Sequence, residues 1–455
     1  MMGGTAAAAA AAGRAEALRH SARPRSAEAP RYAADAAQRV RPAAINAARL
    51  RSRLEALSVY GRPTSAGFDG GVSRVAYSDA DVAARGYVMQ LMRDASLVPR
   101  IDPAGNIFAR REGRDAALKP ILFGSHIDSV PQGGNFDGDL GSLSALEAIE
   151  VLRERGHVTR HPLEIVVWAH EESAAFNRGL AGSRIVAGDF VPADLDQTWN
   201  GLRRDAAIRR IGGAPERIRE AAREKGSLHC YLELHIEQGA TLHRQSIPVG
   251  VVQGIVAIDG FEVVVRGFAN HAGTTLMSER RDALLAASQL ALAVRDVVTA
   301  KPGRQVGTVG RFDVSPNSPN VIPGEVRLSI ELRDLSEETL KELAEAVRVK
   351  AQQIARDTQT EIELTPSRHN PPATADARVQ DAVARAADQL GLGTLRMPSG
   401  AGHDAQMMAR LCPMGMIFVP SIDGISHSPR ELTTWEDCAR GARVLLDTVL
   451  AMDED

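Results

Sequence analysis

The fold of this chain is decided by the stretch PILFGSHIDSVPQGGNFDGDLGSLSALEAIEVLRER, residues 120–155. This stretch passes from an apolar, strand-like run through a polar, glycine-rich loop into a helical pattern. Similar strand-like runs follow at LEIVVWAH (163–170) and YLELHI (231–236), within an alternation that extends from about residue 45 to 254. Such alternation is typical of an α/β fold, in which helices flank a mixed or parallel sheet. We therefore look for chemistry at the polar ends of these strands.

A different order of elements occupies residues 255–369. It reads strand, helix, strand, strand, helix, strand, with strands at 261–267, 305–314, 325–334 and 361–366. Apolar residues alternate at 326, 328, 330 and 332, so one face of this sheet must be covered. A helix that begins after Ser336, the expected N-cap, supplies part of the cover. The order predicts a ferredoxin-like α+β unit.

The α/β pattern resumes after this unit, with helices near 377–390 and 435–451 and a strand at 414–419. We therefore expect the unit to be a lid inserted in a larger domain. The expected divisions are a metal-binding catalytic domain at 43–254 and 370–455, and a lid and dimerisation domain at 255–369. Residues 1–42 form an Ala- and Arg-rich tail that we expect to be disordered, with a transit peptide as the alternative.

Composition narrows the class of protein. The chain has 455 residues, which exceeds the roughly 250–300 at which one core stops growing, so two domains are expected. It is 44% hydrophobic and 24% charged with a formal net charge of −3, which favours a soluble protein and argues against a nucleic-acid partner. Three widely separated cysteines indicate a reducing cytoplasm. No apolar stretch approaches the roughly 20 residues that span a bilayer, so no membrane association is expected.

Four polar clusters carry imidazoles and carboxylates. They are GSHIDSVPQGGNFDGDLG (124–141), WAHEESAAF (168–176), ELHIEQG (233–239) and GISHSPRE (424–431). A mixed nitrogen and oxygen set suits Zn²⁺, Mn²⁺, Co²⁺ or Ni²⁺, and a bridging carboxylate lets five side chains hold two ions. The candidate ligands are His126, Asp137, Glu172, His235 and His427.

Other interpretations of these residues are weaker. A single histidine is more often structural, and Glu171-Glu172 could be a solvated acidic turn, but the like-charge pair at a strand end favours one ligand beside one general base. The segment that begins at His170 is not HExxH, because position 174 is Ala. A serine triad from residues 125–128 fails on geometry. Asp128 is expected to orient His126 instead.

In this order the clusters resemble the M20 family of dinuclear metallohydrolases. More narrowly, they resemble its branch of N-carbamoyl-L-amino acid hydrolases, β-ureidopropionases and allantoate amidohydrolases. The resemblance extends from about residue 45 to 452 and includes the lid. It implies two divalent ions per subunit, with His126 and His235 on one ion, Glu172 and His427 on the other, and Asp137 as the bridge.

The resemblance also implies roles in catalysis and specificity. Glu171 becomes the general base, and His271 on the lid becomes an oxyanion donor that reaches a neighbouring subunit's site. Peptidase branches are expected to carry Asp or Glu in place of His235. The implied substrate contacts are Gln238, His271, Asn320, Arg333, Ser399, Gly400 and His403. The alternatives for these residues are loop and turn positions, a solvated strand face and a glycine-rich connector.

We therefore expect an amidohydrolase that cuts the carbamoyl C–N bond of an N-carbamoyl-L-amino acid or a related ureido acid. Its small-molecule substrate carries a carboxylate, and the protein forms a homodimer through the lid. Allantoate amidohydrolase and β-ureidopropionase activities are the alternatives within the branch. An M20 peptidase or aminoacylase, and a non-catalytic metal-binding protein, are the more distant ones.

Overall fold

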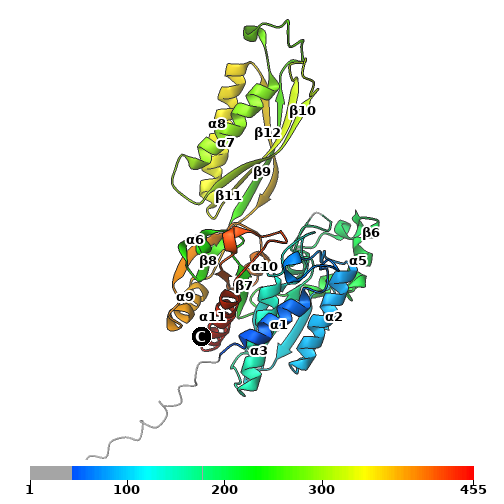
Figure 1. Ribbon diagram of the computed structural model, residues 1–455, viewed down its shortest axis with the longest axis vertical. Coiled ribbons are helices and arrows are strands. Elements are labelled where there is room, and N and C mark those ends of the chain that lie inside the picture. Colours follow the sequence, from blue (N-terminus) through cyan, green and yellow to red (C-terminus); the bar gives the residue numbers. More distant parts are fainter. Residues whose placement is uncertain (1–43, 177) are drawn as a thin grey trace, which may run out of the picture. The chain divides into compact units, whose positions relative to one another are not determined.

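A nine-stranded mixed sheet forms the centre of the larger part of the chain (Figure 1). The computed structural model describes residues 44–176 and 178–455, so the predicted tail, 1–42, lies outside the described residues. In spatial order the strands are β1 (Arg100–Ile101), β2 (Ile107–Arg111), β4 (Leu163–Trp168), β3 (Ile121–His126), β7 (Cys230–Ile236), β15 (Met414–Val419), β8 (Val249–Ile255) and β13 (Ala373–Thr374), and β14 (Thr394–Ser399) also pairs with β8.

The four central strands determine where the polar clusters meet. Strands β4, β3, β7 and β15 are mutually parallel, whereas β2 and β8 run antiparallel to their neighbours β4 and β15. This mixed topology confirms the predicted α/β class. Because the four strands are parallel, their carboxyl ends lie at one edge of the sheet.

Helices cover both faces of this sheet. One face shares an apolar core with α1 (Ala47–Leu57), α2 (Asp79–Asp94), α3 (Asp139–Glu154), α9 (Ala377–Gln389) and α11 (Trp435–Asp453). The other face packs near the shorter α4 (Ala181–Val186), α6 (Thr241–Gln245) and α10 (Asp404–Met408), around Trp168, Tyr231 and Phe418. Every residue of the four central strands is buried, which explains their largely apolar character in the sequence.

A further apolar cluster lies beside the sheet, around Phe176, Ile208 and Ile218. It includes α5 (Arg204–Arg210) and the hairpin of β5 (Thr198–Trp199) and β6 (Leu202–Arg203). Short 3₁₀ turns occur at Phe68–Gly70, Pro192–Asp196, Pro215–Ala221, Met277–Glu279 and Ile422–Gly424. The hairpin and α5 lie between β4 and β7 in the chain and do not join the main sheet.

The lid is a separate four-stranded antiparallel sheet. Its strands lie in the order β10 (Val306–Ser315), β11 (Glu325–Asp334), β9 (Ala257–Arg266) and β12 (Glu361–Asn370). Helices α7 (Ala283–Thr299) and α8 (Glu337–Thr358) lie side by side on one face (Figure 1). The chain order β9, α7, β10, β11, α8, β12 confirms the predicted ferredoxin-like arrangement.

The alternation in β11 has the predicted consequence for packing. The side chains of Val326, Leu328, Ile330 and Leu332 are buried against α7 and α8. Ser336 caps α8, because its side chain accepts a hydrogen bond from the backbone N–H of Thr339 at 3.2 Å. The lid therefore has its own apolar core on one face of its sheet.

Strand β12 is longer than predicted. The predicted strand spans residues 361–366. The structure continues the strand to Asn370 across an irregularity at Ser367, where the pairing with β9 shifts by one residue. A bulge at this point accommodates the proline, so the strand does not end there.

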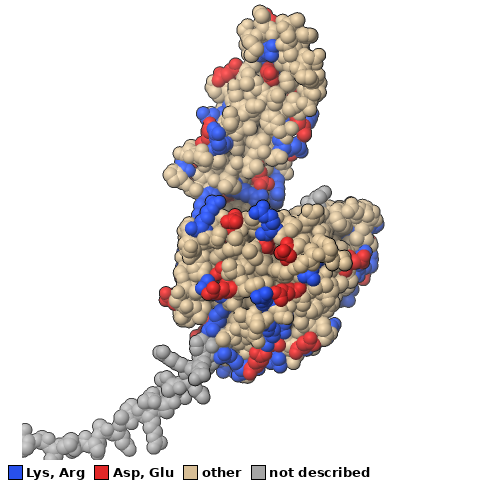
Figure 2. Space-filling model, viewed as in Figure 1, with Lys and Arg blue, Asp and Glu red and all other residues tan. Residues whose placement is uncertain are grey.

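The described residues include no helix that is long and apolar enough to cross a membrane. On the face shown in Figure 2, Lys and Arg are interspersed with Asp and Glu over much of the surface. The three cysteines are buried and unpaired. The cytoplasmic location and the absence of a nucleic-acid partner stay predictions.

Candidate metal centre

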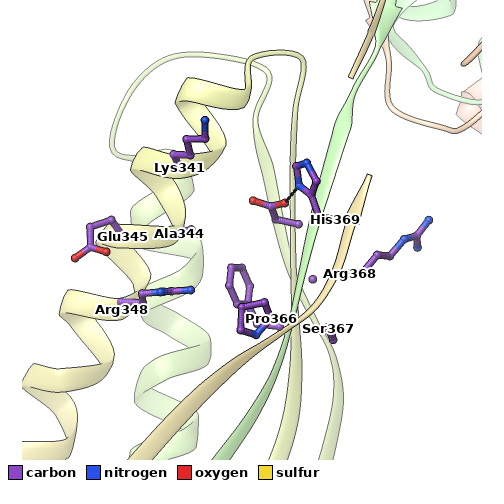
Figure 3. A pocket seen from close by; sticks show the side chains of 11 residues that line it. Lys341, Ala344, Glu345, Arg348, Pro366, Ser367, Arg368 and His369 are labelled. Atoms are coloured by element: carbon purple, nitrogen blue, oxygen red, sulfur yellow. Dashed lines mark hydrogen bonds and ion pairs between the residues drawn. The ribbon is translucent and has the colours of Figure 1, made fainter. Parts of the chain in front are cut away.

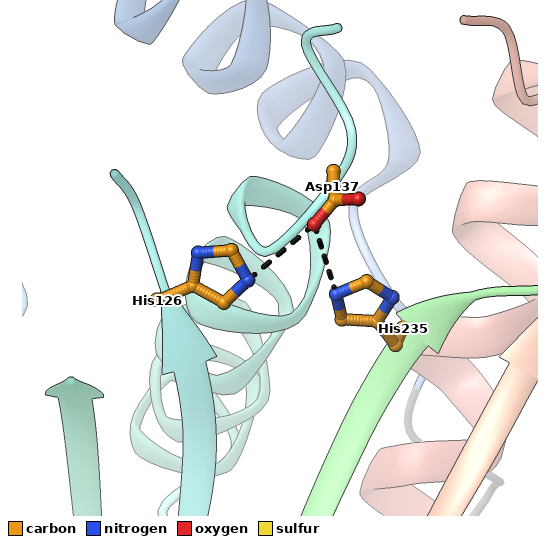
Figure 4. A group of neighbouring side chains, drawn as sticks. All are labelled: His126, Asp137 and His235. Carbon is orange, nitrogen blue, oxygen red and sulfur yellow. Dashed lines mark ion pairs between the residues drawn. The ribbon is translucent and has the colours of Figure 1, made fainter. Parts of the chain in front are cut away.

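The five predicted ligands gather at the carboxyl edge of the parallel strands. His126 is the last residue of β3, and His235 is the penultimate residue of β7. Glu172 follows β4, and His427 lies in the loop after β15. Asp137 precedes α3 and points between the two buried histidines (Figure 4). Parallel strand direction thus unites residues that are far apart in the sequence.

The two carboxylate oxygens of Asp137 face different partners. Oδ1 lies 3.4 Å from His126 Nε2 and 3.2 Å from His235 Nε2. Oδ2 lies 3.6 Å from His427 Nε2, which is itself 3.3 Å from a carboxylate oxygen of Glu172. The result is two groups of three possible ligands that share Asp137.

The spacing of these atoms fits cation coordination. Two ligand atoms bound tetrahedrally at about 2.0–2.2 Å from a zinc-sized ion lie about 3.3–3.6 Å apart. Asp137 lies 3.4, 3.2 and 3.6 Å from the three histidines, and His427 lies 3.3 Å from Glu172. These separations are close to those expected for side chains that share an ion.

The hydrogen bonds of the buried histidines leave their Nε2 atoms available. His126 Nδ1 lies 2.9 Å from the backbone oxygen of Asp128, and His235 Nδ1 lies 3.0 Å from that of Ile236. Each Nδ1 therefore donates its proton to a carbonyl, so Nε2 is the nitrogen that can bind a metal once the ring is neutral. The backbone N–H of Gly138 points at His235 Nε2 at 3.2 Å, as expected for an unprotonated nitrogen. Both rings are held in the tautomer that binds a metal.

The electrostatics also favour bound cations. Burial lowers the pKa of His126, but Glu171 and Asp137 outweigh this effect and raise it well above its usual value. Burial raises the pKa of Glu171 well above its usual value, and repulsion from Glu172 adds to the rise. Without metal, this buried group of acids would therefore hold protons, which divalent ions can displace.

Gly138 allows Asp137 to approach His126. Its φ of 69° lies in the left-handed region, and a Cβ atom there would lie 2.4–2.6 Å from atoms of the His126 ring. Only glycine avoids both the backbone strain and the clash. The loop therefore brings the bridging carboxylate close to β3 and then continues directly into α3.

Asp128 contacts the His126 ring through its backbone oxygen, and its carboxylate has other partners. Its backbone oxygen contacts the ring of His126, but the nearest carboxylate oxygen is 3.9 Å from Nδ1. The two carboxylate oxygens instead accept hydrogen bonds from the backbone N–H groups of Glu171 and Glu172, each at 3.1 Å. Asp128 therefore anchors the turn that carries the expected general base.

Glu171 lies at the centre without belonging to either group of three ligands. Its Oε2 atom is 3.8 Å from His126 Nε2, and the residue is 9% exposed. The adjacent His170 contacts different partners: its ring lies 3.2 Å from the Tyr77 hydroxyl and 2.8 Å from the Ala175 carbonyl oxygen. Burial lowers the pKa of His170 to about 3, so this residue is a neutral structural histidine.

Glu431 supports the loop that carries Asp137, and the sequence did not predict this role. Its Oε1 atom accepts hydrogen bonds from the backbone N–H groups of Phe136 and Asp137 at 2.9 and 3.0 Å. Its Oε2 atom lies 2.8 Å from the hydroxyl of Ser426, which is 3.0 Å from Asp137 Oδ2. The only signal in the sequence is a carboxylate four residues after His427. Glu431 thus joins the loop of the bridge to the loop of another ligand.

Glu233 is a second buried carboxylate that the sequence reasoning missed. It lies on the same face of β7 as His235 and is fully buried. Its oxygens accept hydrogen bonds from the Ser125 hydroxyl at 2.8 Å, and from the Tyr231 hydroxyl and the Ala405 N–H at 3.1 Å each. Glu233 therefore ties the ends of β3 and β7 to the start of α10.

Gln238 is the predicted substrate contact that lies closest to the candidate ligands. Its amide nitrogen donates to Asp137 Oδ2 at 2.6 Å. The side chain of Ser399 hydrogen-bonds within its own loop and lies 3.0 Å from His403 Nε2. The His403 ring centroid is 4.4 Å from that of His235. Gln238 and His403 therefore adjoin the predicted ligands directly.

The remaining predicted contacts form two pairs that include lid residues. The backbone N–H of Ala272, next to His271, donates to the Asn320 carbonyl oxygen at 3.0 Å. Arg333 donates to the backbone oxygen of Gly400 at 2.6 Å and pairs with Glu331 at 2.7 Å. In the part of the chain that the structure describes, no hydrogen bond or ion pair joins these residues to a candidate ligand.

The amino-acid sequence is similar to those of known proteins over most of its length. The profile of peptidase family M20/M25/M40 matches residues 122–451. An N-carbamoyl-L-amino acid amidohydrolase of Geobacillus stearothermophilus is 40% identical over 406 residues, which cover 89% of this chain and 98% of that protein. A ureidoglycolate hydrolase of Arabidopsis thaliana is 37% identical, over 90% of this chain and 87% of that protein.

This chain is also similar to a solved structure over most of its length. The crystal structure of a hydantoinase/carbamoylase family amidase from Burkholderia multivorans superimposes with a TM-score of 0.84 at 35% identity. The match covers 90% of this chain and 99% of that chain. The likeness therefore includes both the sheet with the candidate ligands and the lid.

Replacement of a candidate ligand should lower metal affinity. We expect His235→Ala to weaken binding by more than the roughly 10- to 100-fold that follows loss of a ligand's hydrogen-bonding partner. His157→Ala, just beyond the far end of α3, is the matched control and should bind normally. Elemental analysis after equilibration with a competing chelator measures the difference. Full metal content and normal affinity in His235→Ala would remove this residue from the ligand set.

Loss of Glu431 should lower metal affinity, because Glu431 holds the loop that carries Asp137. Glu431→Ala leaves two buried N–H groups without an acceptor, and we expect about a 10- to 100-fold loss of metal affinity. Glu431→Gln should recover much of this loss, because the amide oxygen can accept the same two hydrogen bonds. The same chelator competition tests both variants. Equal affinity in wild type and Glu431→Ala would contradict the proposed support.

Proposed function

The chain belongs to peptidase family M20/M25/M40, in its hydantoinase/carbamoylase branch, and we propose that it hydrolyses the carbamoyl C–N bond of a ureido acid. The proposed substrate is an N-carbamoyl-L-amino acid or a close relative. The products are the free amino acid, ammonia and carbon dioxide. The observation that carries this proposal is Glu171, a buried carboxylate beside two groups of ligands that share Asp137.

Glu171 suits the role of general base. Its backbone is anchored by Asp128. Burial raises the pKa of its carboxylate, so when bound cations keep it ionised it accepts a proton more readily than an exposed carboxylate does. It can take a proton from the attacking water and return it to the departing nitrogen. The carbamate that remains on the substrate nitrogen then loses carbon dioxide. Atoms balance, because one water is consumed and ammonia is released.

The family has a dinuclear metal site, and we propose Zn²⁺, Mn²⁺, Co²⁺ or Ni²⁺ as its occupants. His126 and His235 would hold one ion, Glu172 and His427 the other, and Asp137 both. When bound, two such ions polarise the scissile carbonyl and acidify the attacking water, which a poorly electrophilic ureido carbon requires.

His271 is our proposed donor to the developing oxyanion in the site of a neighbouring subunit. Its Nδ1 atom accepts hydrogen bonds from the backbone N–H groups of Gly273 and Thr274 at 3.0 and 3.2 Å. The ring proton is therefore on Nε2, on the side away from the loop. This tautomer can donate a hydrogen bond to an oxyanion.

Asn320 and Arg333 are the proposed clamp for the substrate carboxylate. Arg333 already binds the carboxylate of Glu331 at 2.7 Å, which supports the view that its guanidinium can receive such a group. Gln238, Ser399 and Gly400 are the further proposed contacts. A substrate carboxylate would compete with Glu331 for Arg333.

Several substrates remain open within this proposal. N-carbamoyl-β-alanine, allantoate and ureidoglycolate carry the same ureido and carboxylate groups, and the Arabidopsis relative is named as a ureidoglycolate hydrolase. Peptidase or aminoacylase activity is the more distant alternative, because those branches are expected to carry an acid in place of His235. Binding of metal without any hydrolysis would favour a non-catalytic role.

We also propose a homodimer formed through the lid. Strand β10 lies at one edge of the lid sheet and exposes Val306 and Phe312, while α7 exposes Leu285 and Leu292. An exposed edge strand beside apolar side chains is suited to pairing with a second copy. A monomer in sedimentation equilibrium at micromolar concentration would contradict this assembly.

Ammonia release tests the function directly. Protein loaded with Mn²⁺ or Zn²⁺ is assayed against N-carbamoyl-L-amino acids, N-carbamoyl-β-alanine, allantoate and ureidoglycolate, with N-acyl amino acids and dipeptides as controls. We expect metal-dependent release from a ureido substrate. Glu171→Gln should retain metal but lose about 10²- to 10⁴-fold in turnover, the usual contribution of a general base. Hydrolysis of the control substrates alone would move the protein to the peptidase or aminoacylase alternative.

Arg333→Ala should weaken substrate binding. We expect KM to rise about tenfold or more with a smaller change in kcat, because a charge-assisted hydrogen bond to the substrate is lost. Arg327→Ala, on the same strand and paired with Glu325, is the matched control. Steady-state kinetics on the preferred ureido substrate measure both. An unchanged KM would exclude Arg333 from the clamp.

A further inference from the structure

The lid contains a cavity of about 520 Å³ that the proposed chemistry does not use. One wall is a single face of α8, formed by Lys341, Ala344 and Arg348, and the opposite wall is formed by β9 and β12 (Figure 3). Phe261 and Pro366 add apolar surface to the strand wall. The volume is within the roughly 300–1,000 Å³ typical of small-molecule sites. All lining residues belong to the lid, so this cavity is distinct from the metal centre.

Two cations in this cavity have no acidic partner. The guanidinium of Arg348 extends from α8 toward the strands and lies 5.5 Å from the centroid of the Phe261 ring (Figure 3). Its Nε atom is buried without a hydrogen-bond acceptor. Within residues 44–176 and 178–455, neither Arg348 nor Lys341 forms an ion pair or a side-chain hydrogen bond. A buried guanidinium donor without an acceptor is unfavourable unless a ligand supplies one.

The acids around the cavity do not neutralise these cations. Asp259 pairs with His369, whose Nδ1 atom is 2.7 Å from the carboxylate. Glu345 is turned to the side of α8 away from the strands, whereas Arg348 is turned toward them (Figure 3). The unbalanced charge inside the cavity is therefore positive, and it lies next to apolar surface.

The backbone of the strand wall is irregular at this point. Ser367 is the extra residue of β12 opposite β9, and Gly260 faces the irregularity. A Cβ atom at Gly260 would lie 3.1 Å from Ser367 Oγ and 3.2 Å from Arg368 Cβ, which is tighter than ordinary packing. A bulge of this kind changes the direction of side chains and often lies beside a binding site. Here it leaves Arg368 on the side of the sheet opposite Arg348 (Figure 3).

We propose that this lid cavity binds a compact organic carboxylate, with its anionic group on Arg348 and Lys341 and its apolar body against Phe261 and Pro366. A guanidinium presents parallel N–H donors to a carboxylate, and its stacking on an aromatic ring holds it in place for that contact. The cavity also adjoins the first residues of β9 and the last residues of β12, where the lid begins and ends. This site goes beyond the proposed hydrolysis and does not depend on it.

Calorimetric titration of the metal-loaded protein with benzoate tests the site. Benzamide, which has the same shape without the charge, is the ligand control. We expect benzoate to bind wild type and Arg348→Gln to lose about tenfold in affinity, as expected when a charge-assisted pair is removed. Arg356→Gln is the matched control, since this arginine lies on the same helix outside the cavity lining, and it should bind as wild type does. The metal centre is intact in every protein, so the difference between variants belongs to the lid.

Three results would overturn the proposal. The first is the absence of any benzoate binding to wild type. The second is equal binding by wild type and Arg348→Gln, which would show that benzoate binds elsewhere, for example at the metal centre. The third is equal affinity for benzoate and benzamide, which would exclude recognition of an anion. Hydrolytic activity enters none of these readouts, so failure of this site leaves the proposed reaction untouched.

Discussion

The carboxylate of Asp137 is the point on which the candidate site depends. Its two oxygens face two different groups of ligands, at 3.2–3.4 Å on one side and 3.6 Å on the other. Such a bridge requires that the loop before α3 be held within a few tenths of an ångström. Gly138 permits the close approach, and Glu431 binds the backbone on the other side. Gln238 and Ser426 direct Oδ2 from further loops.

The same arrangement couples the metal to the fold. Glu171, Glu172, Asp137 and Glu233 are buried close together, and burial of unpaired carboxylates is strongly unfavourable. In the absence of cations, protons must neutralise Glu171 and Glu172, whose pKa values burial raises. Burial also acts to raise the pKa of Asp137, but His235 and His126 outweigh it and lower that pKa well below its usual value. Bound ions would therefore stabilise the carboxyl edge of the sheet and leave Glu171 ready to accept a proton. The same buried charges therefore affect both the stability of the fold and the proposed activity.

Much of the fold could be predicted because buried strands and helices impose regular patterns. The alternation in β11 and the cap at Ser336 identified the lid, and the polar ends of β3, β4 and β7 identified where the ligands meet. Features that depend on tertiary contacts could not be predicted in this way. The role of Glu431 arises from hydrogen bonds to residues almost 300 positions away, and Asp128 uses its carboxylate on a different strand end. Likewise, the predicted strand ended at residue 366, whereas the structure continues β12 to Asn370 across a bulge.

Anomalous diffraction from crystals of the metal-loaded protein would locate the ions around Asp137. We predict two peaks about 3.5–4 Å apart, one beside each oxygen of Asp137, with His126 and His235 on the first ion and Glu172 and His427 on the second. Glu171 should touch neither ion directly. A single peak, or peaks that do not share Asp137, would contradict the bridge and with it the proposed role of Glu171.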